Sequence, residues 1–168
     1  TEYAGLLDPV IEIAITPNRG DCLGVRGIAR DLAAAGCGTL KDIDFSAEEG
    51  EFVSSLTWHI DEEVSSLVPL ISGRLFEGVS NGSSPAWMAQ RLTAVGQRPI
   101  SALVDITNYV MIDLGRPLHA YDADKVAGDK LTLRFARAGE QVLALNEKTY
   151  DCSSDMLVIS DSDGPDDL

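Results

Sequence analysis

The sequence predicts an α+β fold, in which a short unit of one strand and one helix precedes a mixed, largely antiparallel β domain with two packed helices. Three segments carry apolar residues at helical spacing and end in glycine, whereas the rest is dominated by short alternating runs between turn residues. The chain has 168 residues and 45% hydrophobic content, enough for one core plus a small appended piece. We place the first unit at 1–45 and the second at 46–168.

The N-terminal unit is expected to contain a half-buried strand over 10–15, because VIEIAI alternates apolar and polar residues. Asp21 is the expected N-cap of the following helix. The acidic stretch 41–50 has few large apolar residues and is typical of a linker. The predicted helix face contains Val25, Ile28, Ala29 and Leu32, and the helix is closed by Gly36 and Gly38.

The second unit begins with two expected strands, over 53–60 and 68–79. The sequence NGSSPAW then predicts a helix with Ser84 as N-cap and Pro85 at its first position. Met88, Leu92 and Val95 share one face of this helix, and Gly96 ends it. Further short strands are expected over 131–137, 141–145 and 156–160, with a turn around Asn146 and Glu147 between the last two.

The stretch from 101 to 125 joins a helix to a proline turn that presents a histidine. Gly115 is expected to end the helix in the left-handed conformation that only glycine adopts without a Cβ penalty. Pro117 cannot continue a helix, so His119 should leave in an extended path and be held in place. One helical face contains Leu103, Ile106, Val110 and Leu114.

Charge and composition exclude several classes of protein. The formal net charge of −14 arises from 27 acids against 13 bases, so broad electrostatic binding of nucleic acid is disfavoured, although contact with the end of one remains open. No run approaches the ~20 apolar residues of a membrane span, and the first residues lack the pattern of a signal peptide, so we expect a cytoplasmic protein. Three widely spaced cysteines fit neither a disulfide framework nor a zinc site.

Each candidate residue also has a plain structural interpretation. His119, Asp122 and Asp124 could be read as metal ligands, but the glycine turn of a calcium loop is missing, so a helix N-cap role for either aspartate is favoured. Arg98 precedes a proline and could tie a loop to a carboxylate. His59 is expected to be partly buried beside a tryptophan, without function. No G-x-S-x-G elbow is present, which argues against a serine hydrolase.

Two long blocks carry a resemblance to a known family. ITPNRGDCLGVRGIARDLAA and SPAWMAQRLTAVGQRPISALVDITNYVMIDLGRPLHAYDADK, followed by ARAGEQVLALNEKTYDCSSDMLVISD, closely resemble successive stretches of the β subunit of bacterial phenylalanyl-tRNA synthetase. The resemblance implies that 1–45 is the end of a small N-terminal helical domain. It implies that 46–168 is the first part of the editing domain, which hydrolyses tyrosine wrongly esterified to the phenylalanine tRNA.

The resemblance also assigns roles to particular positions. Arg98 and His119 match the editing motifs and are expected near the ester and the terminal adenosine, where His119 would orient water or ribose hydroxyls and Arg98 would hold a phosphate or carbonyl oxygen. Asp105 and Asn108 match a motif that is expected to be mainly structural. Where the family usually has an aromatic or basic pair, this chain has Leu70 and Ile71, so no contact is assigned there.

Partners and cofactors follow from the same resemblance. They are a synthetase α subunit, which carries the ATP-dependent ligation, an α2β2 tetramer, and the phenylalanine tRNA. ATP and magnesium belong to the whole synthetase, and no cofactor or metal is expected in this chain. Because the family's remaining editing positions are expected past Leu168, the chain alone should be inactive. The alternative is a non-catalytic binding or scaffold module related to the editing domain.

Overall fold

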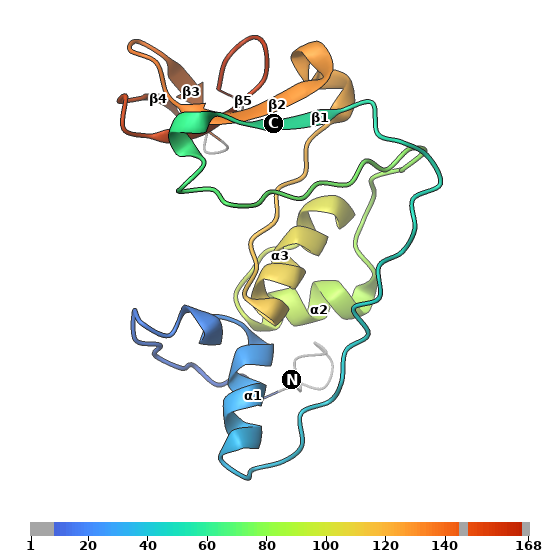
Figure 1. Ribbon diagram of the computed structural model, residues 1–168. Coiled ribbons are helices and arrows are strands. Elements are labelled where there is room, and N and C mark those ends of the chain that lie inside the picture. Colours follow the sequence, from blue (N-terminus) through green and yellow to red (C-terminus); the bar gives the residue numbers. More distant parts are fainter. Residues whose placement is uncertain (1–8, 145–147, 166–168) are drawn as a thin grey trace. The chain divides into compact units, whose positions relative to one another are not determined.

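The computed structural model describes residues 9–144 and 148–165 and confirms the α+β class (Figure 1). The α-helices are α1 (Val25–Ala34), α2 (Ala86–Ala94) and α3 (Ala102–Leu114). The strands are β1 (Thr57–Ile60), β2 (Lys130–Phe135), β3 (Gln141–Leu143), β4 (Thr149–Asp151) and β5 (Leu157–Ser160). Short 3-10 turns are η2 (Gly20–Cys22), η3 (Glu62–Val64), η4 (Ala123–Lys125) and η5 (Ala127–Asp129).

The chain divides into two compact units, each assembled from two separate stretches. The helical unit comprises residues 1–47 and 79–120, and the sheet unit comprises 48–78 and 121–168. The two helices after residue 80 therefore group with α1, not with the strands. The predicted boundary after residue 45 lies close to residue 47, where the chain first passes from the helical unit to the sheet unit. The assignment of 1–45 and 46–168 to two domains of the family remains a prediction.

In the helical unit, the start of α1 and the end of α3 come close together at two glycines, Gly24 and Gly115. A Cβ on Gly24 would lie 2.4 Å from the backbone nitrogen of Gly115, so position 24 has no room for a side chain. Gly115 has φ 72° and ends α3 in the left-handed conformation, as the sequence predicts. On α2, Met88 and Leu92 are buried as predicted, whereas Val95, the third residue of the predicted face, is 45% exposed because the helix ends before it. Gly96 with φ 83° follows the helix, which confirms the predicted stop.

Three sequence-based predictions for this unit are wrong. Residues 10–15 form no strand, because the described part offers them no pairing partner and Ile11 stays 77% exposed. Asp21 is not a helix N-cap, since Gly24 occupies that position and Asp21 pairs with arginines. Ser84 is not the N-cap of α2 either, because Pro85 takes that place and the Ser84 hydroxyl donates to Asp105.

The sheet unit is built on a three-stranded mixed sheet. The strand order is β1-β2-β5, with β1 parallel to β2 and β5 antiparallel to it, and β3 and β4 form a separate antiparallel pair. The register places Thr57 beside Lys130 and Phe135 beside Leu157. The buried residues of this unit are Val64, Val126, Leu131, Leu133, Ala136 and Cys152.

A nearly buried ion pair fastens β2 to the turn before β3. Arg134 Nη1 and Nη2 donate to Glu140 Oε2 and Oε1 at 2.8 and 2.7 Å, so the contact is bidentate. The backbone N–H of Arg137 adds a third bond to Glu140 Oε2 at 2.6 Å. Hydrogen bonding to Arg134 lowers the pKa of Glu140 to about 2. The turn that starts β3 is therefore held by charge as well as by backbone bonds.

The remaining strand predictions are confirmed in part. β2 and β5 fall inside the predicted ranges 131–137 and 156–160 to within a residue, and β3 covers 141–143 of the predicted 141–145. The stretch 53–60 is a strand only over Thr57–Ile60. Residues 68–79 form no strand. Gly73 instead packs against Trp58, where a Cβ would lie 2.3 Å from the indole nitrogen.

Residues 145–147, where a turn was expected, lie outside the described part.

Candidate functional site

Arg98 lies in the loop that connects α2 to α3, and its side chain is exposed. The loop begins where α2 ends: the Gly96 N–H donates to the Thr93 carbonyl at 3.0 Å and the Gln97 N–H donates to the Leu92 carbonyl at 2.9 Å. These bonds satisfy carbonyls that the helix leaves unpaired at its end. They fix the chain immediately before Arg98.

The other end of this loop is held by a buried carboxylate on α3. Asp105 is 0% exposed. Its Oδ1 accepts the Ile100 N–H at 2.9 Å, and its Oδ2 accepts the Ser84 hydroxyl. The start of α3 is tied in addition to the segment before α2, because the Ala102 N–H donates to the Gly82 carbonyl at 2.8 Å. Three parts of the chain, the segment before α2, the Arg98 loop and the first turn of α3, thus meet at Asp105.

His119 follows the other end of α3. It lies in the extended chain after Gly115 and Pro117, is exposed, and belongs to the same compact unit as Arg98. The two residues are separated by the 13 residues of α3, a helix about 20 Å long. Figure 1 shows the chain reversing its direction after α3.

The neighbours of His119 in sequence have separate roles. Asp122 and Asp124 belong to the sheet unit. The Asp124 N–H donates to Asp122 Oδ1 at 3.3 Å at the start of η4, which confirms the N-cap interpretation for Asp122.

Asn108 is half-buried on α3. His59 is more exposed than predicted, since its side chain is 56% accessible, and its Nε2 lies 3.1 Å from Asp61 Oδ1.

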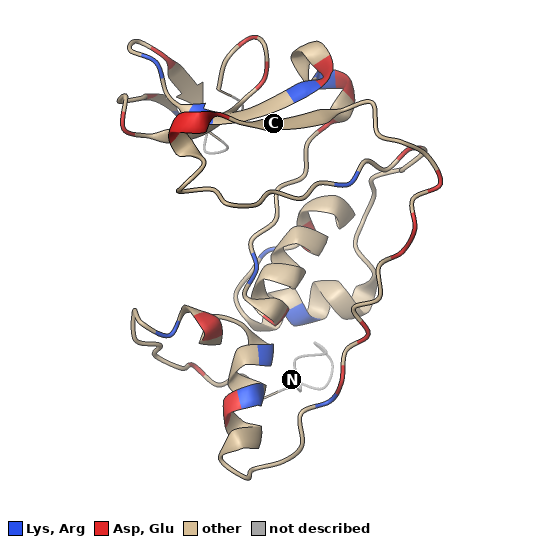
Figure 2. Cartoon of the chain, in the orientation of Figure 1, with Lys and Arg blue, Asp and Glu red and all other residues tan. Residues whose placement is uncertain are grey.

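The surroundings of Arg98 differ in charge from the rest of the chain. Between Glu77 and Asp105 the sequence contains no acidic residue, while it contains Arg91 and Arg98. Asp105 itself is buried. The charged residues of α2 and of the loop that follows it are therefore basic, although the net charge of the chain is −14. Figure 2 colours basic residues blue and acidic residues red along the chain.

A second charged cluster joins η2 to α1. Arg19 Nε lies 3.0 Å from Asp21 Oδ1, Arg19 also binds Asp31, and Arg30 binds Asp21. Hydrogen bonding to Arg19 holds the pKa of the Asp21 carboxyl far below its usual range. Ligand atoms of Asp21, Cys22 and Asp31 lie within 4.8 Å of one another. Because two guanidinium groups already bind the carboxylates, the cluster is better described as an ion-pair network than as a metal site.

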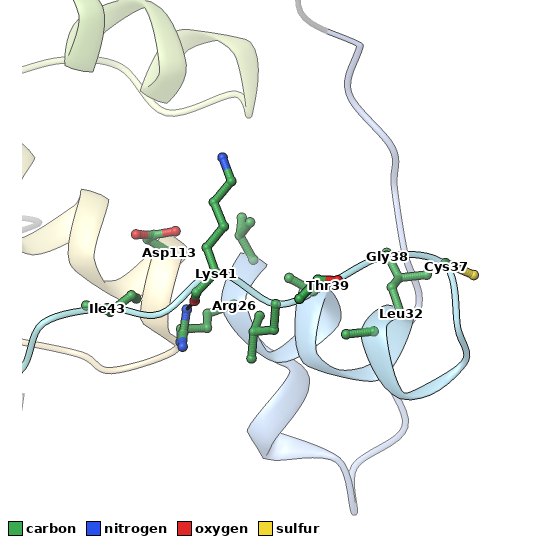
Figure 3. A pocket seen from close by; sticks show the side chains of 12 residues that line it. Arg26, Leu32, Cys37, Gly38, Thr39, Lys41, Ile43 and Asp113 are labelled. Carbon is green, nitrogen blue, oxygen red and sulfur yellow. Dashed lines mark hydrogen bonds between the residues drawn. The ribbon is translucent and has the colours of Figure 1, made fainter.

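Two open hollows in the helical unit lie away from the candidate residues. One, of about 350 Å³, is lined by α1, the segment from Cys37 to Ile43, and Asp113 of α3 (Figure 3). The other, of about 400 Å³, is lined in part by Arg26, Phe45 and Leu114. Neither hollow includes Arg98 or His119.

None of the helices in the described part of the chain has the length and apolar character of a membrane span.

Comparison with known proteins identifies the class. Residues 67–167 match the B3/4 domain family, so this chain belongs to that family. The matched range contains α2, α3, Arg98, Asp105 and His119.

Curated relatives show the kind of protein in which a similar stretch occurs. The chain is 53% identical to the phenylalanine–tRNA ligase beta subunit of Brucella abortus (strain 2308), over 99% of this chain and 21% of the relative. It is 56% identical to the beta subunit of Paramagnetospirillum magneticum, over 96% of this chain and 20% of the relative. The predicted resemblance is thereby confirmed. The chain spans about a fifth of the length of the curated relatives it matches.

Sequence reasoning missed how the Arg98 loop is held. The motif SALVDITNY places Asp105 on a helix in a predominantly apolar context, and a carboxylate in that context is buried only when hydrogen bonded. That signal was available. The partners Ser84 and Ile100 were not predictable, since one lies 21 residues away and the other donates through its backbone.

Proposed function

We propose that this chain is the part of a phenylalanine–tRNA ligase β subunit that contributes to hydrolytic editing of tyrosine mischarged onto the phenylalanine tRNA. The observation that carries the proposal is the 53% identity to such a subunit over 99% of the chain. The B3/4 match over residues 67–167 supports the same assignment. ATP-dependent aminoacylation, with magnesium, is then carried by the partner α subunit in an α2β2 assembly. The cytoplasmic location remains a prediction from the sequence.

Selectivity in this reaction comes from one hydroxyl group. A pocket built to hydrogen-bond the tyrosine hydroxyl leaves buried polar groups unpaired when phenylalanine enters, which provides several orders of magnitude of discrimination. The aminoacylation pocket, which is shaped for phenylalanine, excludes the one added hydroxyl of tyrosine less strongly than the editing pocket excludes phenylalanine. Editing therefore complements aminoacylation.

The hydrolysis needs little more than a positioned water. The water oxygen bonds to the ester carbonyl carbon, the bond from that carbon to the ribose oxygen breaks, and the ribose oxygen takes a proton that came from the water. An aminoacyl ester is already activated, so positioning and electrostatic stabilisation suffice without a covalent nucleophile. In the proposal, His119 orients the water or the ribose hydroxyls, and Arg98 holds a terminal phosphate or the carbonyl oxygen.

Three features of the chain support these roles. Arg98 and His119 are both exposed and belong to one compact unit. The acid-free stretch between Glu77 and Asp105 lowers the repulsion that a chain of charge −14 would otherwise exert on phosphate near Arg98. The turn formed by Gly115 and Pro117 restricts the path of the chain that carries His119.

The test uses the complete synthetase that contains this chain. His119→Ala is expected to lower the rate of deacylation of tyrosyl-tRNA by about 10²-fold, the size typical for misplacing a reacting group, while phenylalanine charging stays near normal. His59→Ala is the matched control, because His59 is the chain's other histidine and is exposed on β1. Unchanged deacylation in the His119 variant would remove this residue from the site.

Arg98 is tested by the pair Arg98→Ala and Arg98→Lys. We expect lysine to restore deacylation only in part, because a point charge does not reproduce the planar fork of a guanidinium group. Arg91→Ala is the control, since Arg91 is an arginine of the same unit that donates to the Tyr109 hydroxyl at 2.6 Å. Full rescue by lysine would favour simple charge attraction over bidentate recognition.

A further inference from the structure

We propose that Asp105 is a positioning residue for the editing reaction, because its carboxylate fixes the backbone from which Arg98 reaches the substrate. The inference rests on the proposed role of Arg98. It gives Asp105 a function in the reaction, beyond the structural role expected for its motif.

The geometry leaves Arg98 between two anchored amides. On one side the Gln97 N–H is bonded to the Leu92 carbonyl at the end of α2, and on the other the Ile100 N–H is bonded to Asp105 Oδ1 at 2.9 Å. Between them, Pro99 has no N–H and a φ restricted by its ring. Only Arg98 and Pro99 lie between the two anchors. Releasing the Asp105 bond would free one end of this short span.

The position of Asp105 makes it a firm anchor. It lies in the first turn of α3, its own N–H donates to the Ser101 carbonyl at 2.8 Å, and it is fully buried. Its second oxygen accepts the Ser84 hydroxyl, so the side chain cannot rotate without losing a bond on each side.

Apolar packing does not explain a carboxylate at this position. Burying a charge is costly unless it is compensated, and the ion pairs recorded among the described residues do not include Asp105. Its compensation consists of the hydrogen bonds from Ile100 and Ser84, the two donors that hold the Arg98 loop and the segment before α2. The Asp105 side chain therefore holds the Arg98 loop and the segment before α2 in place.

Positioning of this kind has a measurable effect on rate. A displacement of about 1 Å in a group that contacts the substrate can cost about 10²-fold in rate. Asp105→Ala removes both acceptor oxygens and should lower deacylation of tyrosyl-tRNA by about tenfold or more. Asp105→Asn retains a carbonyl oxygen for the Ile100 N–H and an amide for Ser84, so deacylation should stay near normal.

The decisive experiment is a double-mutant cycle in the complete synthetase. Deacylation kcat and KM are measured for Asp105→Ala alone, for Arg98→Ala alone and for the two combined, with phenylalanine charging as the check on folding. We expect Asp105→Ala to lower deacylation when Arg98 is present and to have no further effect when Arg98 is alanine. Equal losses in both backgrounds would overturn the inference, because a merely structural role acts whether or not Arg98 is present.

The cycle separates the two claims. If Arg98→Ala alone leaves deacylation unchanged, the proposed role of Arg98 fails, and the inference that depends on it fails too. If Arg98→Ala lowers deacylation but the effects of the two substitutions are additive, only the inference fails. Thr107→Ala is the matched control, since it removes a hydroxyl of the same helix that donates to the Val104 carbonyl at 2.7 Å and leaves both bonds of Asp105, so deacylation should be retained.

A second measurement covers the case in which Asp105→Ala does not fold. Hydrogen exchange of the Ile100 amide is then compared between the wild type and Asp105→Asn, together with deacylation. The inference requires that protection of this amide and deacylation be retained together or lost together. Deacylation lost with the amide still protected, or retained with the amide unprotected, would overturn it.

Discussion

Replacing Glu140 by glutamine removes the anionic half of the ion pair with Arg134 and leaves a guanidinium group whose side chain is only 7% exposed. The ordinary pKa of 4.5 falls to about 2 in the folded chain, chiefly through the hydrogen bond from Arg134. A difference of that size corresponds to about 3 kcal/mol. Breaking one partner of a buried pair typically costs about 3–5 kcal/mol. Because Glu140 is 18% exposed, we expect a loss of about 2–3 kcal/mol at pH 7.

The pH dependence gives this prediction its direction. A carboxyl whose folded pKa is lowered contributes its stability above the unfolded value, and loses it as the pH falls through the folded value. The free energy of unfolding of the wild-type chain should therefore exceed that of Glu140→Gln at pH 7. The difference should shrink from about pH 4.5 downward and approach zero near pH 2.

Urea unfolding of both chains at several pH values, followed by far-UV circular dichroism, measures the difference directly. Glu63→Gln is the control, because Glu63 is an exposed acid of the same unit and should change the stability by less than about 0.5 kcal/mol. A difference that stays constant between pH 7 and pH 2, or one below about 0.5 kcal/mol at pH 7, would refute the reasoning.

Two further predictions concern the helical unit and the isolated chain. Gly27→Ala should destabilise the chain by about 1–3 kcal/mol, because the added Cβ would lie 2.0 Å from the Asp21 carbonyl oxygen. Thermal unfolding measures the loss, with Gly20→Ala as the control because nothing lies within 4 Å of a Cβ there. Equal melting temperatures for the two variants would contradict the predicted clash. The 168-residue chain alone should deacylate mischarged tRNA very slowly even at low salt, because it carries a charge of −14 and spans about a fifth of its relatives. Rapid, tyrosine-selective deacylation would show that the chain contains a complete editing centre.

Local signals were predictive where a single residue determines the backbone. Gly115 and Pro117 ended α3 as expected, because a left-handed residue and a missing N–H act without help from distant parts of the chain. Gly96 ended the preceding helix for the same reason. Exposure of Arg98 and His119 also agrees with the candidate site, although their roles remain proposals.

Predictions failed where a distant partner decides the outcome. The alternation in 10–15 fits a strand, but a strand forms only where another strand pairs with it. Ser84 has the right side chain and position for an N-cap, yet its hydroxyl donates to Asp105 on α3. The buried Arg134–Glu140 pair was not predicted either, since exposed and buried ion pairs have the same sequence pattern.

The interleaved division of the chain has a consequence for synthesis on the ribosome. Both units are assembled from two stretches, and the chain passes between them after residues 47, 78 and 120. The first strand, β1, must wait for β2 to emerge, because Thr57 pairs with Lys130. Contacts so distant in sequence form slowly. A nascent chain that stops at residue 120 therefore contains both stretches of the helical unit, but β1 in segment 48–78 has no partner strand until β2 is made. Unpaired strands exposed in this way are prone to wrong pairing.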